Sequence, residues 1–325
     1  MDKVIGQKRV LLTYVKPGDR RFLFLSLFLF IIVGLFSCTQ SGKREASAGP
    51  NVILISIDTL RADHLRAYGY EKIETPNIDA LANEGVLFKK TYAHAPITLP
   101  SHTSILTGTY PNFHGVRNNG EFRASEKLTT AAEIFKSAGY GTAAFVGAFV
   151  MDSRFGLDQG FDLYDDDMTG EGKIRAQFVY KERSAQAVVK RATDWLDKRL
   201  EKRSGSPPFF IFLHLFDPHM IYDPPEPFRS RYSDNPYDGE IAYADSQVGV
   251  FLEKLKELKL YDNTLIVLTS DHGESLGEHG ERTHAIFIYN ATIWVPLVMK
   301  LPGGQNAGAV IERMTRHIDI LPTMV

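Results

Sequence analysis

The sequence contains a single cysteine, Cys38, in 325 residues. One thiol cannot form a disulfide within the chain or a metal site built from several thiolates. Cys38 follows an apolar N-terminal stretch and precedes the first strand and helix patterns. A cysteine nucleophile is therefore excluded for the folded domain.

Neither sign of charge dominates, because 37 Lys and Arg residues stand against 39 Asp and Glu residues. The sequence also lacks a basic stripe interleaved with aromatic residues, so we expect no nucleic-acid partner. The hydrophobic content of 44% and the charged content of 23% are typical of a globular protein and argue against disorder.

The N-terminus indicates export. Arg20 and Arg21 precede an apolar run from Phe22 to Phe36, which is shorter than the roughly 20 residues of a membrane-spanning helix but suits a signal-peptide core. The residues that lead to Cys38 resemble a bacterial lipobox, in which the cysteine is lipidated. We predict a signal peptide or membrane anchor at 1–37, a tether at 38–50 and a folded domain at 51–325.

Two other interpretations of residues 1–37 remain open, an uncleaved signal anchor and a buried helix of the domain. Either the signal peptide or the anchor would place the domain in the cell envelope, tethered to the membrane with its fold outside the cytoplasm.

From residue 51 onward, short apolar runs alternate with amphipathic stretches. This alternation predicts an α/β fold with a doubly wound, mostly parallel sheet and helices on both faces. We expect surface excursions at 164–181 and 224–238, which are polar. The predicted strands are 52–57, 141–147, 209–216, 265–269 and 296–301, and the predicted helices are 128–138, with a capping box at Thr130 and Glu133, 184–200 and 240–258.

Three predicted strands end in residues that bind metals. Because ligands bind at the carboxyl ends of strands in open α/β sheets, we expect these side chains to converge. A single Asp at a strand end is usually a helix cap or turn former, but three sets together favour a metal site. They are Asp58 after the first strand, Asp217 and His219 after the third, and Asp271 with His272 after the fourth.

A hydroxyl residue, Thr98, precedes a short predicted helix that starts near Pro100 and Ser101 and ends at Gly108. A metal ion and the positive end of the helix would both favour its alkoxide and an incoming anionic ester. The alternative, that Thr98 and Ser101 are only helix caps, stays open on this segment alone.

Four motifs together resemble the sulfatase-like branch of the alkaline phosphatase superfamily, in its order and at its spacing. They are Asn51–Asp63 (NVILISIDTLRAD), Thr75–Ala82 (TPNIDALA), Thr98–Gly115 (TLPSHTSILTGTYPNFHG) and Thr269–Gly280 (TSDHGESLGEHG). The resemblance implies that Thr98 is the nucleophile, and it implies a metal site that Thr98 shares with Asp58, Asp271 and His272. It also implies that His219 and His284 face the substrate or a second metal.

The chain departs from the sulfatase motif at the nucleophile. That motif begins with Cys or Ser, which is converted to formylglycine, whereas Thr98 cannot yield this aldehyde. His102 replaces the motif arginine and joins Thr98, His219 and His284 as a catalytic candidate. Threonine is the nucleophile in related phosphodiesterases, nucleotide pyrophosphatases and phosphoglycerol or phosphoethanolamine transferases, so we expect direct attack by Thr98 on phosphorus without formylglycine.

The ligand types favour zinc or manganese over calcium or magnesium. The resembled sulfatases often carry a second Asp and an Asn where this chain has Thr59 and His272, and an imidazole among carboxylates suits the softer metals. Whether Asp217, His219 and His284 form a second metal site stays open. We interpret His214, in the middle of an apolar strand, as a core histidine.

We therefore predict a metal-dependent hydrolase that cleaves phosphate mono- or diesters of small molecules or of the cell envelope through Thr98. The alternatives are a sulfuric ester hydrolase, a phosphoryl transferase and a truncated, non-catalytic binding protein. The last follows from the end of the sequence at Val325, where the resembled family usually continues into a C-terminal subdomain.

Overall fold

The computed structural model describes residues 49–169, 173–174, 181–202 and 207–325. The predictions for the signal segment, Cys38 and most of the tether lie outside these residues. The fold therefore belongs to the unit that starts at Gly49. Within the described residues, we find no helix with the length and apolar character needed to cross a bilayer.

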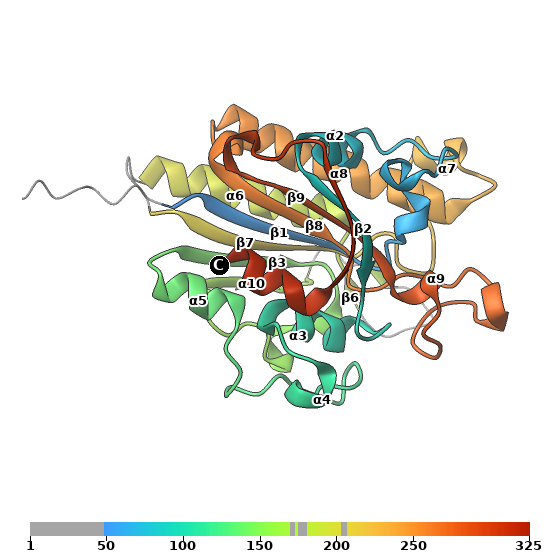
Figure 1. Cartoon of the computed structure of the whole chain (residues 1–325), viewed down its shortest axis with the longest axis horizontal. Helices are drawn as coiled ribbons and strands as arrows, with labels where there is room; N and C mark the ends of the chain where they lie inside the picture. The colour runs from blue at the N-terminus through green and yellow to red at the C-terminus, as the bar shows by residue number, and fades with distance from the viewer. Residues whose placement is uncertain (1–48, 170–172, 175–180, 203–206) are drawn as a thin grey trace, which may run out of the picture. The chain divides into compact units, whose positions relative to one another are not determined.

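An eight-stranded sheet forms the centre of this unit, in the order β10-β2-β9-β8-β1-β7-β3-β4 (Figure 1). Only β9 runs against its two neighbours, β8 and β2, while every other pair is parallel. This confirms the predicted α/β fold with a mostly parallel sheet. The strands are β1 (Asn51–Ile57), β2 (Val86–Tyr92), β3 (Gly141–Val146), β4 (Leu163–Asp165), β7 (Phe209–Leu215), β8 (Thr264–Thr269), β9 (Trp294–Lys300) and β10 (Ala309–Arg316), and β5 (Lys173–Ile174) pairs with β6 (Lys181–Glu182) in a small second sheet.

Helices cover both faces of the sheet, as predicted (Figure 1). Alternate residues of β1 point to opposite faces, so Ile53, Ile55 and Ile57 join one core and Val52 and Leu54 the other. The first core is covered by α2 (Pro76–Glu84), α6 (Ala185–Lys202) and α8 (Pro236–Glu257), and the second by α3 (Thr98–Thr107), α5 (Ala131–Ser137) and α10 (Ile320–Met324). Three short helices complete the set, α4 (Pro111–His114), α7 (Phe228–Arg231) and α9 (Asn290–Ile293).

Helix boundaries follow the local capping signals. Thr130 and Glu133 form the predicted capping box at the start of α5. Helix α8 begins four residues earlier than predicted, because Asn235 caps it and Pro236 occupies its first turn. Helix α3 begins at Thr98 itself, so Thr98 is its first residue and the predicted start near Pro100 and Ser101 was two to three residues too late.

The site is positioned by three adjacent parallel strands, β7, β1 and β8. Since the three strands run in the same direction, Asp217, Asp58 and Asp271 all lie at the carboxyl edge of the sheet. Helix α3 packs against the same part of the molecule, below the sheet in Figure 1.

Candidate active site and metal centre

The turn after β1 brings two strand ends into contact. Thr59 adopts a left-handed backbone conformation with φ of 56°, which costs a β-branched residue roughly 1–2 kcal/mol. In this conformation its N–H donates to Asp271 Oδ1 at 3.2 Å. The Tyr237 hydroxyl supports the turn by donating to the Thr59 carbonyl at 2.7 Å. A strained turn therefore orients the carboxylate of Asp271.

Two buried carboxylates face the same space. Asp58 and Asp271 are fully buried, and both oxygens of Asp58 and Oδ2 of Asp271 make no hydrogen bond of normal geometry with any residue in the described ranges. Burial raises the pKa of Asp58 well above its usual value, and the charges of Asp271 and Glu274 raise this pKa further. Carboxylates buried without partners are costly unless a cation compensates them.

His272 supplies the nitrogen of this cluster. Its Nδ1 lies 2.9 Å from the Gly273 carbonyl, so Nδ1 carries the proton and Nε2 has a free lone pair. Burial lowers the pKa of His272 well below its usual value, so the ring is neutral. Nε2 lies 3.4 Å from Asp271 Oδ2 and 3.9 Å from Asp58 Oδ1. One nitrogen lone pair and the oxygens of two carboxylates thus converge on the same space, an arrangement that fits a divalent cation.

Thr98 lies beside the same cluster, and its hydroxyl Oγ1 is 3.4 Å from His272 Nε2. As the first residue of α3 it has only 1% of its surface exposed. The next residue, Leu99, donates its N–H to Asn119 Oδ1 at 2.9 Å, which fixes the start of the helix. The structure therefore brings together all four residues for which sequence predicted a shared metal site.

His102 has a different position from the one expected of a catalytic residue. Its Nδ1 donates to the Thr98 carbonyl at 2.9 Å, and its Nε2 lies 2.9 Å from the Ser56 hydroxyl. Both ring nitrogens are thus engaged with groups behind Thr98. His102 thus holds the backbone at Thr98 and is not among the described residues that line the cavity, so its predicted catalytic role stays a prediction.

His214 is fully buried in β7, as interpreted from sequence, but it is not remote from the site. Its Nε2 lies 3.4 Å from Asp58 Oδ2 and makes no hydrogen bond. A second possible ligand group combines His214 with His102 and Asp271. Because both nitrogens of His102 are engaged, the group of Asp58, Asp271 and His272 is the better metal site.

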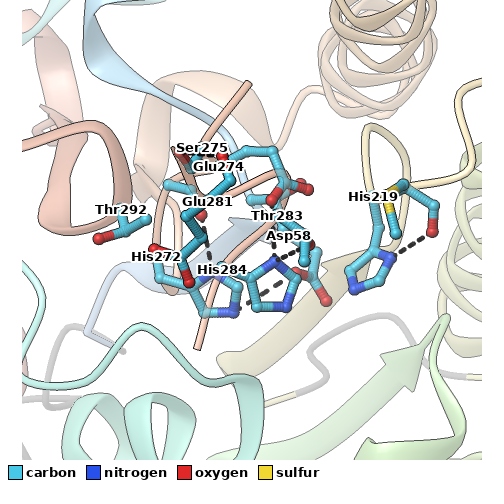
Figure 2. Close-up of polar contacts among 12 residues, drawn as sticks. Asp58, His219, His272, Glu274, Ser275, Glu281, Thr283, His284 and Thr292 are labelled. Atoms are coloured by element: carbon cyan, nitrogen blue, oxygen red, sulfur yellow. Dashed lines mark hydrogen bonds and ion pairs between the residues drawn. The ribbon is translucent and has the colours of Figure 1, made fainter. Parts of the chain in front are cut away.

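A cavity of about 270 Å³ opens beside Thr98 and is also lined by His219 and His284. Figure 2 shows His284 between His272 and His219, with ring centroids 4.3 Å and 5.0 Å away. The His284 Nδ1 lies 3.0 Å from Oε1 of the fully buried Glu274. This pairing is an orienting contact for an acid or base.

His219 is neutral, because burial first and the nearby His284 second lower its pKa to about 3. Its Nδ1 donates to the Met220 carbonyl at 2.7 Å, and its ring stacks on Phe216. Asp217 instead accepts the N–H of Ala185 at 2.7 Å and so caps α6. Among the described residues, neither His219 nor Asp217 belongs to a group that could hold a second metal.

Glu274 is the residue of the site that sequence analysis missed. Glu274 lies three positions after Asp271, inside the motif Thr269–Gly280. The available signal was therefore an acidic residue in the loop that follows a strand with candidate metal ligands at its end. Its partner His284 comes ten positions later, on the far side of a turn. The sequence contains no periodic pattern that predicts this contact.

Comparison with known proteins places this geometry in a family. A family model described as Sulfatase matches residues 50–325. The ulvan-active sulfatase of Formosa agariphila is 28% identical over 91% of this chain and 66% of its own length, and an arylsulfatase of Clostridium perfringens is 26% identical over 85% and 74%. The chain thus spans about two thirds of the length of the first of these relatives.

A phosphonate monoester hydrolase of Agrobacterium radiobacter has a similar solved structure, with a TM-score of 0.69 and 24% identity over 84% of this chain and 72% of that one. At this identity the likeness shows the shared fold only. The family model covers almost the whole described domain. The chain therefore belongs to the sulfatase family, within the alkaline phosphatase superfamily.

Proposed function

We propose that this protein hydrolyses phosphate esters through Thr98 with the help of one divalent metal ion. The observation that carries the proposal is the position of the Thr98 hydroxyl. It lies at the first residue of α3, 3.4 Å from His272 Nε2, and opens onto the cavity. The helix N-terminus favours negative charge on this oxygen and on the bound ester.

The metal would be held by Asp58, Asp271 and His272 with Thr98, and it would supply positive charge that lowers the pKa of the hydroxyl and polarises the ester. One imidazole among carboxylates favours zinc or manganese over calcium or magnesium.

In the first step, Thr98 Oγ1 releases its proton to solvent and forms a bond to phosphorus as the bond from phosphorus to the ester oxygen breaks, and the alcohol leaves with a proton from His284. Water then attacks phosphorus, the bond from phosphorus to Thr98 Oγ1 breaks, and this oxygen regains its proton from solvent. His284 is the donor of the leaving-group proton, because Glu274 engages its Nδ1 and Nε2 is left for the cavity. The same nitrogen takes a proton from water in the second step.

A sulfate ester is the second candidate substrate, and the names of the curated relatives favour it, since both relatives above are sulfatases. The nucleophile favours phosphate, because Thr98 cannot form the aldehyde that the sulfatase motif supplies. Transfer of the phosphoryl group to an alcohol instead of water uses the same first step and differs only in the acceptor.

The substrate is tested with 4-nitrophenyl phosphate, a 4-nitrophenyl phosphodiester and 4-nitrophenyl sulfate. The purified protein is stripped of metal and reloaded with zinc, manganese, magnesium or calcium. We expect phosphoester cleavage with zinc or manganese. Cleavage of the sulfate alone would select the second candidate, and formation of a phosphorylated alcohol when glycerol is added would indicate transfer.

His284→Asn should lower kcat/KM for esters of alkyl alcohols by about 100-fold or more, because these leaving groups need a proton. It should lower kcat/KM for nitrophenyl esters much less. Glu274→Gln should show the same dependence on leaving group with a smaller loss. The measurement is kcat/KM over a series of alcohols of increasing pKa. An equal loss for all leaving groups would contradict the role of His284 as proton donor.

We also propose that Cys38 anchors the protein to a membrane, with the domain in the cell envelope. The support is the apolar run before Cys38 and its resemblance to a lipobox. When the full chain is expressed in a bacterium, Triton X-114 should extract it into the detergent phase. Cys38→Ser should move it to the aqueous phase or leave the signal segment uncleaved, whereas unchanged partitioning and processing would refute lipidation.

A further inference from the structure

Ser101 lies fully buried on helix α3, three residues after Thr98. Its hydroxyl does not cap the helix, because the N-cap residue of α3 is Ile97. The hydroxyl instead donates to the backbone carbonyl of Asp271 at 2.5 Å. Asp271 follows β8, so this hydrogen bond joins the helix that begins with the proposed nucleophile to the loop that carries a candidate metal ligand.

Asp271 is held from two sides. Its carboxylate Oδ1 accepts the N–H of Thr59 at 3.2 Å and the N–H of His272 at 2.9 Å, which fixes the side chain. Its carbonyl accepts the Ser101 hydroxyl, which fixes the backbone from the side of α3. Oδ2 makes no hydrogen bond of normal geometry in the described part of the chain and lies 3.4 Å from His272 Nε2. The contacts to Oδ1 and to the carbonyl therefore direct Oδ2 toward the candidate metal site.

His317 contacts the Ser101 hydroxyl from the C-terminal part of the chain. It is fully buried in the short 3₁₀ turn His317–Asp319, between β10 and α10. Its Nδ1 lies 3.1 Å from Ser101 Oγ. The Ser101 hydroxyl gives its single hydrogen to the carbonyl of Asp271, which can only accept, so His317 Nδ1 carries a proton and donates to Oγ. Two hydrogen bonds in series thus run from His317 through Ser101 to Asp271.

Packing alone does not account for a histidine at position 317. Burial first and the nearby His94 second lower the pKa of His317 to about 3, so its ring is neutral. Its second ring nitrogen, Nε2, makes no hydrogen bond of normal geometry with the residues that the structure describes. An apolar side chain of similar volume would avoid the cost of burying this nitrogen. The contact from Nδ1 to Ser101 is therefore the best explanation for the imidazole.

A second pair of histidine and serine on the same helix provides an internal comparison. His114 Nε2 lies 3.1 Å from the hydroxyl of Ser104, and His114 Nδ1 accepts the N–H of Val116 at 3.1 Å. Both His114 and Ser104 are buried. Within the described ranges, the Ser104 hydroxyl makes no hydrogen bond to a residue of the candidate metal site. The two pairs share residue types, helix and burial, and they differ in the contact with a candidate ligand.

We propose that Ser101 and His317 are positioning residues, which hold Asp271 and the start of α3 in the arrangement that metal binding and attack by Thr98 require. Neither side chain is among the described residues that line the cavity beside Thr98. Loss of either should therefore weaken metal binding and lower kcat without changing KM. The inference rests on the proposed metal-dependent hydrolysis and assigns a role in it to the C-terminal part of the chain.

The first test measures the affinity of the metal-free protein for zinc and manganese by isothermal titration calorimetry. Ser101→Ala and His317→Leu should each raise Kd about 10- to 100-fold, as is typical when a group that orients a ligand is lost. His317→Asn places an amide nitrogen near the position of Nδ1 and should keep Kd within about 3-fold of the parent value.

His114→Leu is the matched control, and its Kd should equal that of the parent, because the Ser104 hydroxyl does not contact Asp271. Similar losses of affinity in His114→Leu and His317→Leu would show a general effect of packing on α3 and would overturn the positioning role. Ser101→Ala keeps the test valid if a histidine variant fails to fold.

The double variant Ser101→Ala with His317→Leu tests whether the two residues act in series. Because His317 acts through Ser101, its loss should raise the Kd of Ser101→Ala by less than about 2-fold. Losses that multiply in the double variant would mean that His317 acts by another route, which would contradict its place in the proposal.

Kinetics separate this inference from the proposed function. At saturating metal, Ser101→Ala and His317→Leu should lower kcat on the best nitrophenyl ester about 10-fold and keep KM within about 2-fold of the parent value. Parent-like metal affinity in both variants, or a change in KM alone, would overturn the inference and leave the proposed hydrolysis intact. A parent protein that binds neither metal and cleaves no nitrophenyl ester would refute the proposed function, and the inference with it.

Discussion

Thr98→Val should reduce ester hydrolysis by roughly 10³-fold or more, the loss typical of removing a nucleophile from a catalytic unit. Valine keeps the shape and β-branching of threonine and removes only the hydroxyl that lies 3.4 Å from His272 Nε2. Thr98→Ser keeps a hydroxyl at the start of α3 and should retain measurable turnover. The measurement is kcat on the best nitrophenyl ester, at saturating metal.

Thr103→Val provides the matched control for this experiment. Thr103 is buried in the same helix, and its hydroxyl donates to the Leu99 carbonyl at 2.7 Å without lining the cavity. This variant should lose little activity. Trapping of ³²P on the parent protein at low pH, but not on Thr98→Val, would identify the phosphothreonine. Parent-like rates in Thr98→Val would refute Thr98 as the nucleophile.

The positions of the residues in the candidate metal site were predictable because they depend on topology and not on details of packing. Asp58 and Asp271 follow apolar runs that are buried on both faces, as β1 and β8 are in the structure. A buried parallel strand leaves a strong signal in sequence, and the residue after it lies at the carboxyl edge. The convergence of residues more than 200 positions apart therefore followed from the strand assignments.

The outer strands of the sheet were not predicted, for a physical reason. β10 is an edge strand with mostly exposed side chains, and β2 contains Lys89 and Lys90 in its centre. Strands of this kind lack a continuous apolar run. β4 is only three residues long and falls at the start of a segment expected to be a surface excursion.

The roles of the histidines could not be read from sequence, because they depend on the directions of side chains. His102 and His284 both lie near Thr98, but His102 points to Ser56 and the Thr98 backbone, while His284 points to Glu274. The sequence gives the same information for both histidines, namely residue type and spacing, and neither indicates the direction of the side chain. Only the helical position of His102, four residues after Thr98, explains its contact with the Thr98 carbonyl.

Asp58→Asn should change stability in opposite directions with and without metal. In the metal-free protein, Asp58 is a buried carboxylate without hydrogen bonds, next to Asp271. An amide of the same shape removes its charge, so we expect a free energy of unfolding about 1–3 kcal/mol higher than in the metal-free parent. The measurement is denaturant unfolding after treatment with a chelator.

The pH dependence of the metal-free proteins has a defined sign. Because the folded-state pKa of Asp58 is raised by burial and by Asp271, the native protein binds more protons than the unfolded chain. Its contribution to stability is full below the usual pKa of Asp and is lost as pH rises through the raised pKa. Asp58→Asn should lack this part of the decline, so the gap between variant and parent should widen toward neutral pH.

Adding metal should reverse the order of the two proteins. A ligand that binds only the native state at 1,000 times its Kd stabilises it by about 4 kcal/mol, and the parent should show a gain of this size with zinc or manganese. Asp58→Asn should show little or none, and its hydrolytic activity should fall by roughly 10³-fold, since the site loses one of its two carboxylate ligands.

Asp245→Asn separates the loss of a metal ligand from the loss of any buried carboxylate. Asp245 is as deeply buried, but it accepts hydrogen bonds from Ile78 and Asn77 at 2.7 Å and 2.8 Å, so an amide there should lower stability. The stabilisation by metal should be unchanged in this variant. If Asp58→Asn destabilised the metal-free protein as Asp245→Asn does, Asp58 would be a structural carboxylate and the metal site would have to be elsewhere. If Asp58→Asn raised the free energy of unfolding of the metal-free protein and Asp245→Asn lowered it, Asp58 would belong to a cluster of negative charge that destabilises the fold and serves metal binding.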